Sequence, residues 1–361
     1  MVLARQCVQS ISQSGVFLMS NKKVAVVGAG IYGSTIALFL SKTGFQVELF
    51  DPLGILNATS AINQYRVHGG YHYPRSVQTI REVQEARDLF ISEFRDSIVN
   101  KFEHLYAIPH EGSMTSPDDF YAVCYQENLA LQEVRPNWMN YEFIERCFKV
   151  DEVLYDPDIL RSIVSTRIQF SSINFRREWF FESMEHDYDH VIYATYATGK
   201  TAVNMFDNWR IQVVEKILIR LPTPLDRQSL VVIDGPFTAF DPYAGSGYSL
   251  FGSARHTTHW QTSDPTEAIP ERYVPLLHTA CWQKVGFSHF DLMRQEAKQV
   301  APSAVHASYI GSRFALRLIE HNPQEDRRIL HIKQKENLVF VFSGKVVSAV
   351  KAAHIVGSIL S

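Results

Sequence analysis

The sequence of 361 residues is poor in cysteine. It holds four, Cys7, Cys124, Cys147 and Cys281, which form no C-x-x-C pair and no spacing typical of a zinc site. Scattered thiols are typical of proteins in a reducing compartment, where disulfides rarely persist. We therefore expect free cysteines and a cytoplasmic protein.

Long hydrophobic runs and an excess of positive charge are also missing. No segment approaches the roughly 18 apolar residues of a membrane-spanning helix, and the N-terminal region has no continuous apolar stretch of signal-peptide length. Lys and Arg number 35 against 38 Asp and Glu, which gives a net charge of −3. A surface that follows nucleic-acid phosphates needs a basic excess. We expect neither a membrane span nor nucleic acid as a main partner.

The motifs of several enzyme classes are absent as well. The chain has no G-x-S-x-G, no P-loop and no paired Cys/His nucleophile pattern, so hydrolysis and phosphoryl transfer have no support. The spacing His256-x-x-His259 has no third ligand nearby in the sequence and no H-E-x-x-H pattern. The sequence therefore predicts no metal site.

What remains is the composition of an ordinary globular protein. Hydrophobic residues make up 46% and charged residues 20%, close to the average for soluble domains. At about 150 residues per domain, the length indicates roughly two domains. The polar, irregular stretch over residues 1–18, ahead of Met19, is predicted to be a flexible extension.

The segment from Lys23 to Asp51 carries the clearest local pattern. An apolar run predicts a buried strand, Gly28-x-Gly30-x-x-Gly33 predicts a tight turn, and an apolar stripe at helical spacing follows. A second apolar run then predicts a strand that ends at Asp51. Strand, helix and strand in this order form a βαβ unit, which builds a parallel sheet.

The glycine turn of this unit indicates a dinucleotide site. Glycines permit a tight turn and a close approach of the backbone to a pyrophosphate, which the N-terminus of the helix then faces. The carboxylate at the end of the second strand is placed to bind an adenosine ribose. The motif alone does not separate a nicotinamide from a flavin. The expected contacts are Gly28, Gly30, Ile31, Tyr32, Gly33 and Asp51.

Later segments predict a second domain. The β-rich runs over 211–221, 230–234 and 249–253 are separated by turns that contain proline or glycine, as in an antiparallel sheet. A long helix is predicted over 77–98. Near the end, an apolar strand leads into a helix over 345–360.

The predicted fold is therefore α/β, with a Rossmann-like dinucleotide-binding domain on a parallel sheet and an α+β substrate domain on a mostly antiparallel sheet. The dinucleotide-binding domain is assigned to 19–97, 148–208 and 309–361, and the substrate domain to 98–147 and 209–308.

Three further motifs carry a family resemblance. They are Ser60-x-x-Asn63 followed by His68-Gly69-Gly70 and Tyr73-Pro74, the strand Val191–Thr195, and Phe342-Ser343-Gly344-Lys345 before the last helix. In this order they resemble the D-amino-acid-oxidase-like superfamily of FAD-dependent oxidoreductases. That superfamily includes glycine oxidase, sarcosine oxidase, 2-hydroxyglutarate dehydrogenase and glycerol-3-phosphate dehydrogenase. Tyr196 stands where the family usually has glycine, which is typical of a distant subfamily.

The resemblance implies that FAD is the cofactor and that the loop and the last turn line it. By that resemblance His68 approaches the flavin ring and His72 the substrate side, although either histidine could be structural. Arg66 is either a flavin or substrate contact or part of a loop salt bridge. Lys345 either stabilises the anionic reduced flavin or is solvated at the helix start. The implied FAD contacts are Ser60, Asn63, Gln64, Arg66, Thr195, Gly344, Lys345 and Val346.

Arg313 is the first candidate for recognition of an anionic substrate. The resemblance places Gly311-Ser312-Arg313 in a turn before the final βα unit, where family members carry an arginine that grips a carboxylate or phosphate. The planar fork of arginine suits such groups. Arg317 is the second candidate, and a salt bridge is the alternative role for Arg313.

The sequence thus predicts an FAD-dependent oxidoreductase that transfers a hydride to flavin N5 from a C–N or C–OH carbon of a small, polar, anionic substrate. His68 or His72 would serve as the base for an alcohol. The alternatives are a nicotinamide-dependent dehydrogenase, a non-redox flavoenzyme such as a sugar mutase, and a non-catalytic dinucleotide-binding subunit. The electron acceptor and the covalent or non-covalent attachment of FAD stay open.

Overall fold

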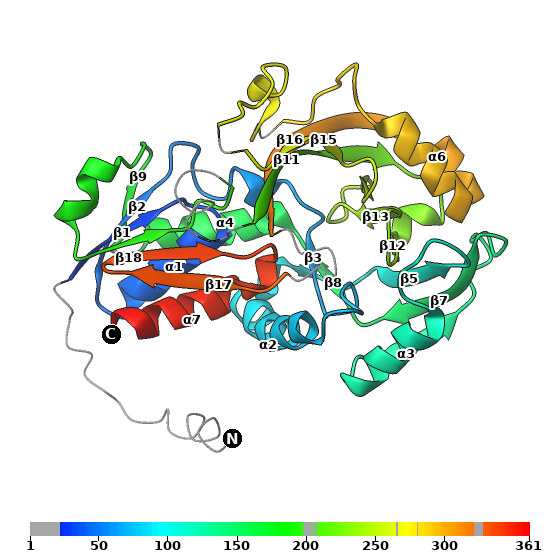
Figure 1. Cartoon of the computed structure of the whole chain (residues 1–361), viewed down its shortest axis with the longest axis horizontal. Coiled ribbons are helices and arrows are strands. Elements are labelled where there is room, and N and C mark those ends of the chain that lie inside the picture. The colour runs from blue at the N-terminus through cyan, green and yellow to red at the C-terminus, as the bar shows by residue number, and fades with distance from the viewer. Residues whose placement is uncertain (1–21, 198–204, 206–207, 265, 280, 321–327) are drawn as a thin grey trace.

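The computed structural model describes residues 22–197, 205, 208–264, 266–279, 281–320 and 328–361. The predicted extension over 1–18 lies outside this part of the chain. Two large sheets lie side by side, and each is built from segments that are far apart in the sequence (Figure 1). The predicted α/β fold with one parallel and one mostly antiparallel sheet is confirmed.

Among the described residues, six strands form the first sheet, in the order β17-β18-β10-β1-β2-β9. All neighbours are parallel except β17 and β18. These strands are β1 (Lys23–Val27), β2 (Gln46–Phe50), β9 (Asn174–Arg176), β10 (His190–Tyr193), β17 (His331–Lys335) and β18 (Leu338–Phe342). The predicted βαβ unit is β1, helix α1 (Ile31–Lys42) and β2.

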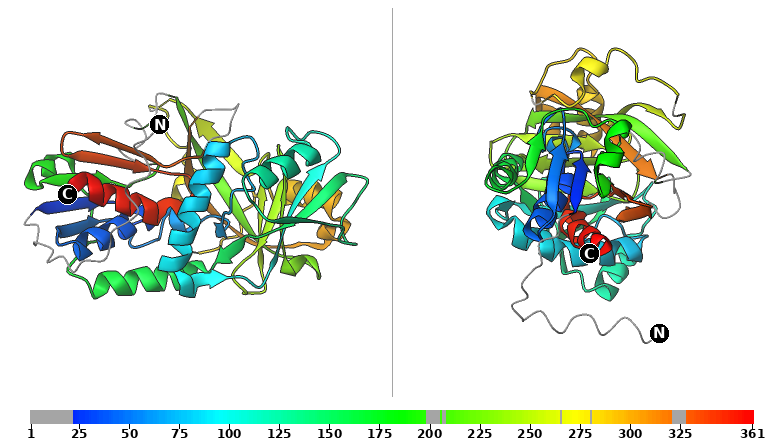
Figure 2. Two further views of the ribbon diagram at one scale, coloured as in Figure 1. Left: turned by 90° about the horizontal axis from the view of Figure 1, so that it is seen from below. Right: turned by 90° about the vertical axis from the view of Figure 1, so that its left-hand side faces the viewer.

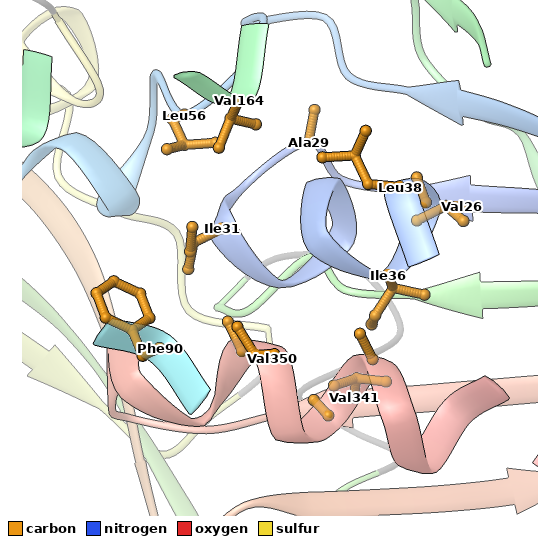
Figure 3. Close-up of a cluster of buried hydrophobic side chains, with 14 of the residues drawn as sticks. Val26, Ala29, Ile31, Ile36, Leu38, Leu56, Phe90, Val164, Val341 and Val350 are labelled. Atoms are coloured by element: carbon orange, nitrogen blue, oxygen red, sulfur yellow. The ribbon is translucent and has the colours of Figure 1, made fainter. Parts of the chain in front are cut away.

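Helix α1 packs against the last helix, α7 (Ala349–Leu360), and against α4 (Pro157–Gln169). A Cβ atom added at Gly357 of α7 would lie 2.3 Å from the Phe39 ring, so this glycine lets the two helices approach closely. Figure 3 shows the core between them, where Ile31 and Ile36 of α1 face Val350 of α7. This packing fixes the start of α1 beside the end of β18.

Among the described residues, nine strands form the second sheet, in the order β15-β11-β14-β13-β12-β5-β7-β6, with β16 also paired to β11. Its pairs are antiparallel except β12 with β5. The strands are β5 (Glu103–Pro109), β6 (Leu131–Val134), β7 (Ile144–Val150), β11 (Trp209–Arg220), β12 (Gln228–Val232), β13 (Thr238–Pro242), β14 (Ser249–Ser253), β15 (Thr258–Thr262) and β16 (Ser308–Glu320).

The remaining elements are short or connect the two sheets. Helix α3 (Pro117–Gln126) begins after Ser116, whose hydroxyl accepts from the Asp119 amide and caps the helix. The other elements are α6 (Phe290–Val300), the strands β3 (Arg66–Val67), β4 (Ile98–Val99) and β8 (Val153–Tyr155), and the 3₁₀ turns η1 (Thr59–Ala61), η2 (Arg95–Ser97), η3 (Glu182–Asp187), η4 (Leu225–Arg227), η5 (Val274–Leu276), η6 (Pro302–His306) and η7 (Val346–Ser348).

Helix α2 (Val77–Glu93) runs across the junction of the two sheets (Figure 2). Its residue Ile80 packs in the core beside β5 and β7, and Phe90 packs in the core of the first sheet. The helix is shorter than the predicted 77–98. It gives way to a 3₁₀ turn because Ser97 donates both its amide and its hydroxyl to the Phe94 carbonyl, and the chain then pairs with β8 as β4.

The predicted turn at Gly311-Ser312-Arg313 is wrong, because these residues lie inside the 13-residue strand β16. Arg313 pairs with Lys216 of β11, and the alternate residues Phe314 and Leu316 are buried on the opposite face. The domain boundary predicted at residue 309 therefore assigns β16 to the wrong sheet. The chain rejoins the parallel sheet at β17.

In the part of the chain that the structure describes, no helix has the length and apolar character needed to cross a membrane.

Candidate active site

The glycine turn between β1 and α1 leaves no room for side chains. Gly28 has a φ of +98°, and a Cβ atom there would lie 2.8 Å from the Ala194 carbonyl oxygen. A Cβ atom at Gly33 would lie 1.8 Å from the Gly28 carbonyl oxygen. Gly30 is the N-cap of α1, so the backbone amides of the first turn face the space above the sheet. This is the geometry that a pyrophosphate requires.

Asp51 ties the end of β2 to that turn. Its Oδ2 accepts from the Ala29 amide at 2.7 Å, and its Oδ1 accepts from the amides of Leu53 and Gly54 at 2.8 and 3.2 Å. Burial raises the pKa of Asp51 above its ordinary value, although the three backbone donors act in the opposite direction. The ribose contact inferred from the sequence stays a prediction.

A cavity of about 590 Å³ opens beside this carboxylate. Pro52 follows Asp51 in the chain, and the rest of the wall comes from the segment after β9. The other lining residues are Arg177, Glu178, Trp179, Phe181 and Met184. The arrangement offers a mostly apolar slot next to the expected ribose position.

The loop after β2 is shaped by its own polar side chains. Ser60 accepts from the Ile31 amide at 3.0 Å, which docks the loop on the start of α1. Asn63 accepts from the Tyr65 amide at 2.7 Å and the Tyr155 hydroxyl at 3.0 Å, and its amide donates to the Ser60 carbonyl. The structure therefore gives Ser60 and Asn63 loop contacts within the protein.

Arg66 lies in a buried ion network that joins this loop to the second sheet. Its Nη1 lies 3.0 Å from Glu152 Oε2 and its Nη2 lies 2.7 Å from Asp241 Oδ1, and all three side chains are almost wholly buried. Glu152 also accepts from the Gly69 amide at 2.8 Å and the Tyr106 hydroxyl at 3.1 Å. The sequence allows two roles for Arg66, a flavin or substrate contact and a loop salt bridge. In the structure Arg66 forms the salt bridge.

The two loop histidines lie next to one another in this network. Their ring centroids are 5.6 Å apart, and His68 Nδ1 is 3.7 Å from Glu152 Oε1. Burial and then the nearby Lys345 ammonium lower the pKa of His68 to about 4 and hold the pKa of His72 well below its ordinary value. Both rings are therefore neutral at pH 7, and both are weak bases.

Lys345 lies at the start of η7, beside the histidines. Its ammonium is 4.1 Å from the centroid of the Tyr73 ring, and its carbonyl accepts from the Tyr32 hydroxyl of α1. Desolvation, with a further contribution from Arg66, lowers the pKa of Lys345 to about 7. A freely solvated lysine would keep its ordinary pKa. Lys345 is therefore not the solvated lysine of the second alternative.

Tyr196 follows β10 at the position where the family usually has glycine. It adopts a positive φ of 56°, which is uncommon for residues other than glycine. Its ring stacks on Phe342 of β18 at 5.3 Å and 5°. The turn shape is therefore kept, and Thr195 still approaches Gly28 closely.

A larger cavity of about 710 Å³ lies over the second sheet, with Gln64 and His72 of the loop in its wall. Gly252 of β14 leaves space for Gln64 and Lys216, since a Cβ atom there would lie 2.7 Å from Gln64 Nε2. Among the described residues that line the cavity, one acid, Asp234, faces five cations, and this acid is paired with Arg75. The cations are Arg210, Lys216, Arg255, Arg317 and Arg328.

Two of these cations lie on neighbouring strands at the centre of the wall. Burial and then the charge of Arg317 lower the pKa of Lys216 to about 8. Arg317 donates from Nε to Gln212 at 2.8 Å and from Nη2 to Thr258 at 3.3 Å. Both side chains are thus held in a region of excess positive charge, which an anion would relieve.

Arg313, the first sequence candidate for the anion, does not line this cavity. Its guanidinium lies 4.2 Å from the Trp282 ring centroid and donates to the Ala61 carbonyl at 3.3 Å. Arg317, the second candidate, does line it. Lys216 and Arg210 were not identified from the sequence. The sequence pattern that could have shown them is the alternation along a long strand, which puts Arg210, Gln212 and Lys216 on one face.

The Arg66 network yields a stability prediction. Replacing Arg66 by methionine leaves Glu152 and Asp241 buried without their cation, which is expected to lower the free energy of unfolding by about 3–5 kcal/mol. Urea denaturation measures this loss. Arg81→Met is the matched control, because the Arg81 side chain, which pairs with Glu127, is 65% exposed. A loss for Arg66→Met no larger than that for the control would contradict the prediction.

Residues 23–133 match the family model of the FAD dependent oxidoreductases, abbreviated DAO. The FAD-dependent monooxygenase FPY4 of Fusarium mangiferae is 22% identical over 335 residues, which is 90% of this chain and 87% of the relative. The FAD-dependent monooxygenase kojA of Aspergillus flavus is 29% identical over 136 residues, or 36% of this chain and 32% of the relative.

Solved structures share the fold. Glycine oxidase from Geobacillus kaustophilus aligns with a TM-score of 0.69 and 12% identity over 94% of this chain and 95% of the other. L-α-glycerophosphate oxidase from Mycoplasma pneumoniae with FAD bound aligns with a TM-score of 0.67 and 13% identity, over 95% of each chain. The resemblance found in the sequence is confirmed, and with it FAD as the cofactor. Residues 23–133 therefore match the DAO family of FAD-dependent oxidoreductases, and the chain shares the fold of glycine oxidase and L-α-glycerophosphate oxidase.

Proposed function

We propose that the chain oxidises a small anionic compound at a C–N or C–OH bond. The observation that carries this proposal is the cavity with five cations, which opens beside Gln64 and His72 of the loop expected to line the flavin. Bound FAD supplies the hydride acceptor. The substrate carbon loses a hydride, its amine or hydroxyl loses a proton, and an imine or carbonyl is left.

The residues present fit FAD. A side chain at Gly28 or Gly33 would collide with backbone atoms, so only glycine fits at these positions of the turn. We call this turn the glycine cradle. We assign the pyrophosphate to Gly28, Gly30, Ile31, Tyr32 and Gly33. We assign the ribose to Asp51 with the adjacent slot for the adenine, and the flavin surroundings to Ser60, Asn63, Gln64, Thr195, Gly344, Lys345 and Val346. Arg66 acts on this loop through its ion pairs.

The roles assigned to the other side chains follow from their charge. Arg317 and Lys216 bind the anionic group, because both are cations in the cavity wall and burial desolvates Lys216. His72 lines the cavity and is neutral, so it can accept the substrate proton, but its lowered pKa makes it a weak base. Lys345 places a positive charge near the flavin position, where it favours the anionic reduced form.

The relatives FPY4 and kojA, both named as FAD-dependent monooxygenases, support a second candidate, a monooxygenase. Such an enzyme inserts one oxygen atom from O₂ and needs an external reductant. The two candidates differ in one readout. An oxidase or dehydrogenase substrate bleaches the flavin without air, whereas a monooxygenase substrate leaves the flavin oxidised until a reductant is added.

The glycine cradle gives a prediction on cofactor retention. Gly28→Ala puts a Cβ atom on a residue with positive φ and close to the Ala194 carbonyl oxygen. This strain costs about 1–3 kcal/mol. FAD affinity should therefore fall roughly 5-fold to 150-fold. The ratio of flavin to protein absorbance after gel filtration measures the loss. Gly286→Ala, where a Cβ atom meets nothing within 4 Å, should keep its FAD. Equal FAD content in both variants would refute the cradle.

The anion assignment separates two arginines of the same strand. Arg317→Ala should raise the substrate concentration needed for half-maximal anaerobic flavin reduction by about 30-fold or more, since losing a desolvated charge pair costs roughly 2–5 kcal/mol. Arg313→Ala should leave that concentration within a factor of about three. Arg220→Ala, at the exposed end of β11, serves as the control. If only Arg313→Ala weakens substrate binding, the anion is bound by Arg313, as the sequence predicts, and the assignment to Arg317 is wrong.

Lys345 is predicted to set the flavin reduction potential. Lys345→Met removes a cation from the reduced flavin anion, so the two-electron potential should fall by about 30 mV for each 1.4 kcal/mol lost. Dye-equilibrated reduction of the holoenzyme gives this value. Lys351→Met is the control, because Lys351 lies in the adjacent helix and pairs with the exposed Glu85. A potential equal to that of the control would remove Lys345 from this role.

A further inference from the structure

One carboxylate and two imidazoles meet in the second sheet, next to the basic cavity, whose wall includes His259. Glu215 neighbours Lys216 in β11, and its side chain lies on the opposite face because successive residues of a strand alternate. His259 comes from β15, and His289 directly precedes α6. One candidate ligand atom from each residue lies within 4.8 Å of the other two.

The Glu215 carboxylate is wholly buried, at 0% exposure. Its Oε2 lies 2.8 Å from His259 Nε2 and accepts from the His289 amide at 3.0 Å, and Ser312 donates to its Oε1. Among the described residues, no lysine or arginine forms an ion pair with it. Burying a carboxylate without a full positive charge nearby is costly. A metal cation bound beside Glu215 would balance the charge of its carboxylate.

The two imidazoles are arranged as ligands. Their rings lie parallel, with centroids 3.7 Å apart and 9° between planes. His289 Nδ1 lies 2.7 Å from the His256 carbonyl. A carbonyl only accepts, so Nδ1 carries the hydrogen and the lone pair is on Nε2. A backbone carbonyl that fixes the tautomer in this way is typical of histidines that bind metal.

Aromatic rings pack around His259, whose side chain is 3% exposed. Phe314, Tyr273 and Phe287 contact its ring at centroid distances of 5.2, 5.9 and 6.0 Å. An apolar shell strengthens the interaction between a cation and its ligands because it removes competing water.

We propose that Glu215, His259 and His289 bind a divalent transition-metal ion, for which zinc is the best fit. Two imidazoles and one carboxylate suit zinc, whereas magnesium and calcium prefer oxygen ligands throughout. Ser312, which already contacts Glu215, or a water molecule would complete the tetrahedron. The ion ties β11 and β15 to the start of α6 behind the cavity wall, so its role is structural.

This site could not be found from the sequence, since its ligands come from three distant segments. The visible His256-x-x-His259 spacing is misleading, because His256 contributes its backbone carbonyl and not its ring to the cluster.

The test is the zinc content of the FAD-loaded enzyme, purified without metal affinity, incubated with zinc sulfate and gel-filtered. Elemental analysis should give about one zinc per chain for the wild type. His289→Ala should retain less than a tenth of that amount. His256→Ala is the matched control and should retain all of it, because its backbone carbonyl stays in place. The flavin spectrum reports that each variant is folded.

A melting experiment gives an independent readout. Added zinc should raise the Tm of the wild type and of His256→Ala by several degrees and leave His289→Ala unchanged, because only a metal that binds the folded state stabilises it. Equal zinc content and equal Tm shifts in the wild type and His289→Ala would overturn the proposal. A loss of zinc in His256→Ala as large as in His289→Ala would overturn this ligand set.

Discussion

The buried ion network around Arg66 is the interaction on which the proposed site depends. Arg66 belongs to the loop expected to line the flavin, Glu152 follows β7, and Asp241 lies in β13 of the second sheet. Breaking a buried pair leaves an uncompensated charge, so the three side chains hold one another in place. The network fixes His68 through Glu152 and, by holding the loop on the sheet, places Gln64 and His72 in the cavity wall.

Electrostatics then sets what this arrangement can bind. Arg66 and Lys345 lie near the histidines, and Lys216 and Arg317 lie in the cavity wall. Burial, and then this crowding of cations, lower the pKa values of Lys216 and Lys345 to about 8 and about 7. An anion that enters the region relieves the repulsion between these cations. A reduced flavin and an anionic substrate are the two anions that the proposed reaction brings there, so one charge distribution serves both.

The sequence predicts what depends on neighbouring residues. The β1–α1–β2 unit, its glycine turn and the Ser116 cap are local, and all three are present in the structure. Gly311-Ser312-Arg313 is different, because its strand character comes from pairing with β11, far earlier in the chain. The salt bridge of Arg66 stayed an open alternative for the same reason, since its partners come from two other segments. Lys216 carries no motif, and only the fold shows that it faces a cavity.

Anaerobic flavin reduction by the wild-type holoenzyme tests the central claim most directly, namely that the basic cavity selects an anionic substrate beside the flavin. The flavin absorbance is followed with pairs of amines or alcohols that differ only in one group, a free carboxylate against its methyl ester or a phosphate monoester against the free alcohol. The account predicts that the anionic member of a pair bleaches the flavin, and that its neutral partner requires at least about a 30-fold higher concentration, as expected when a desolvated charge pair is missing. Equal bleaching by both members of every reactive pair would contradict it.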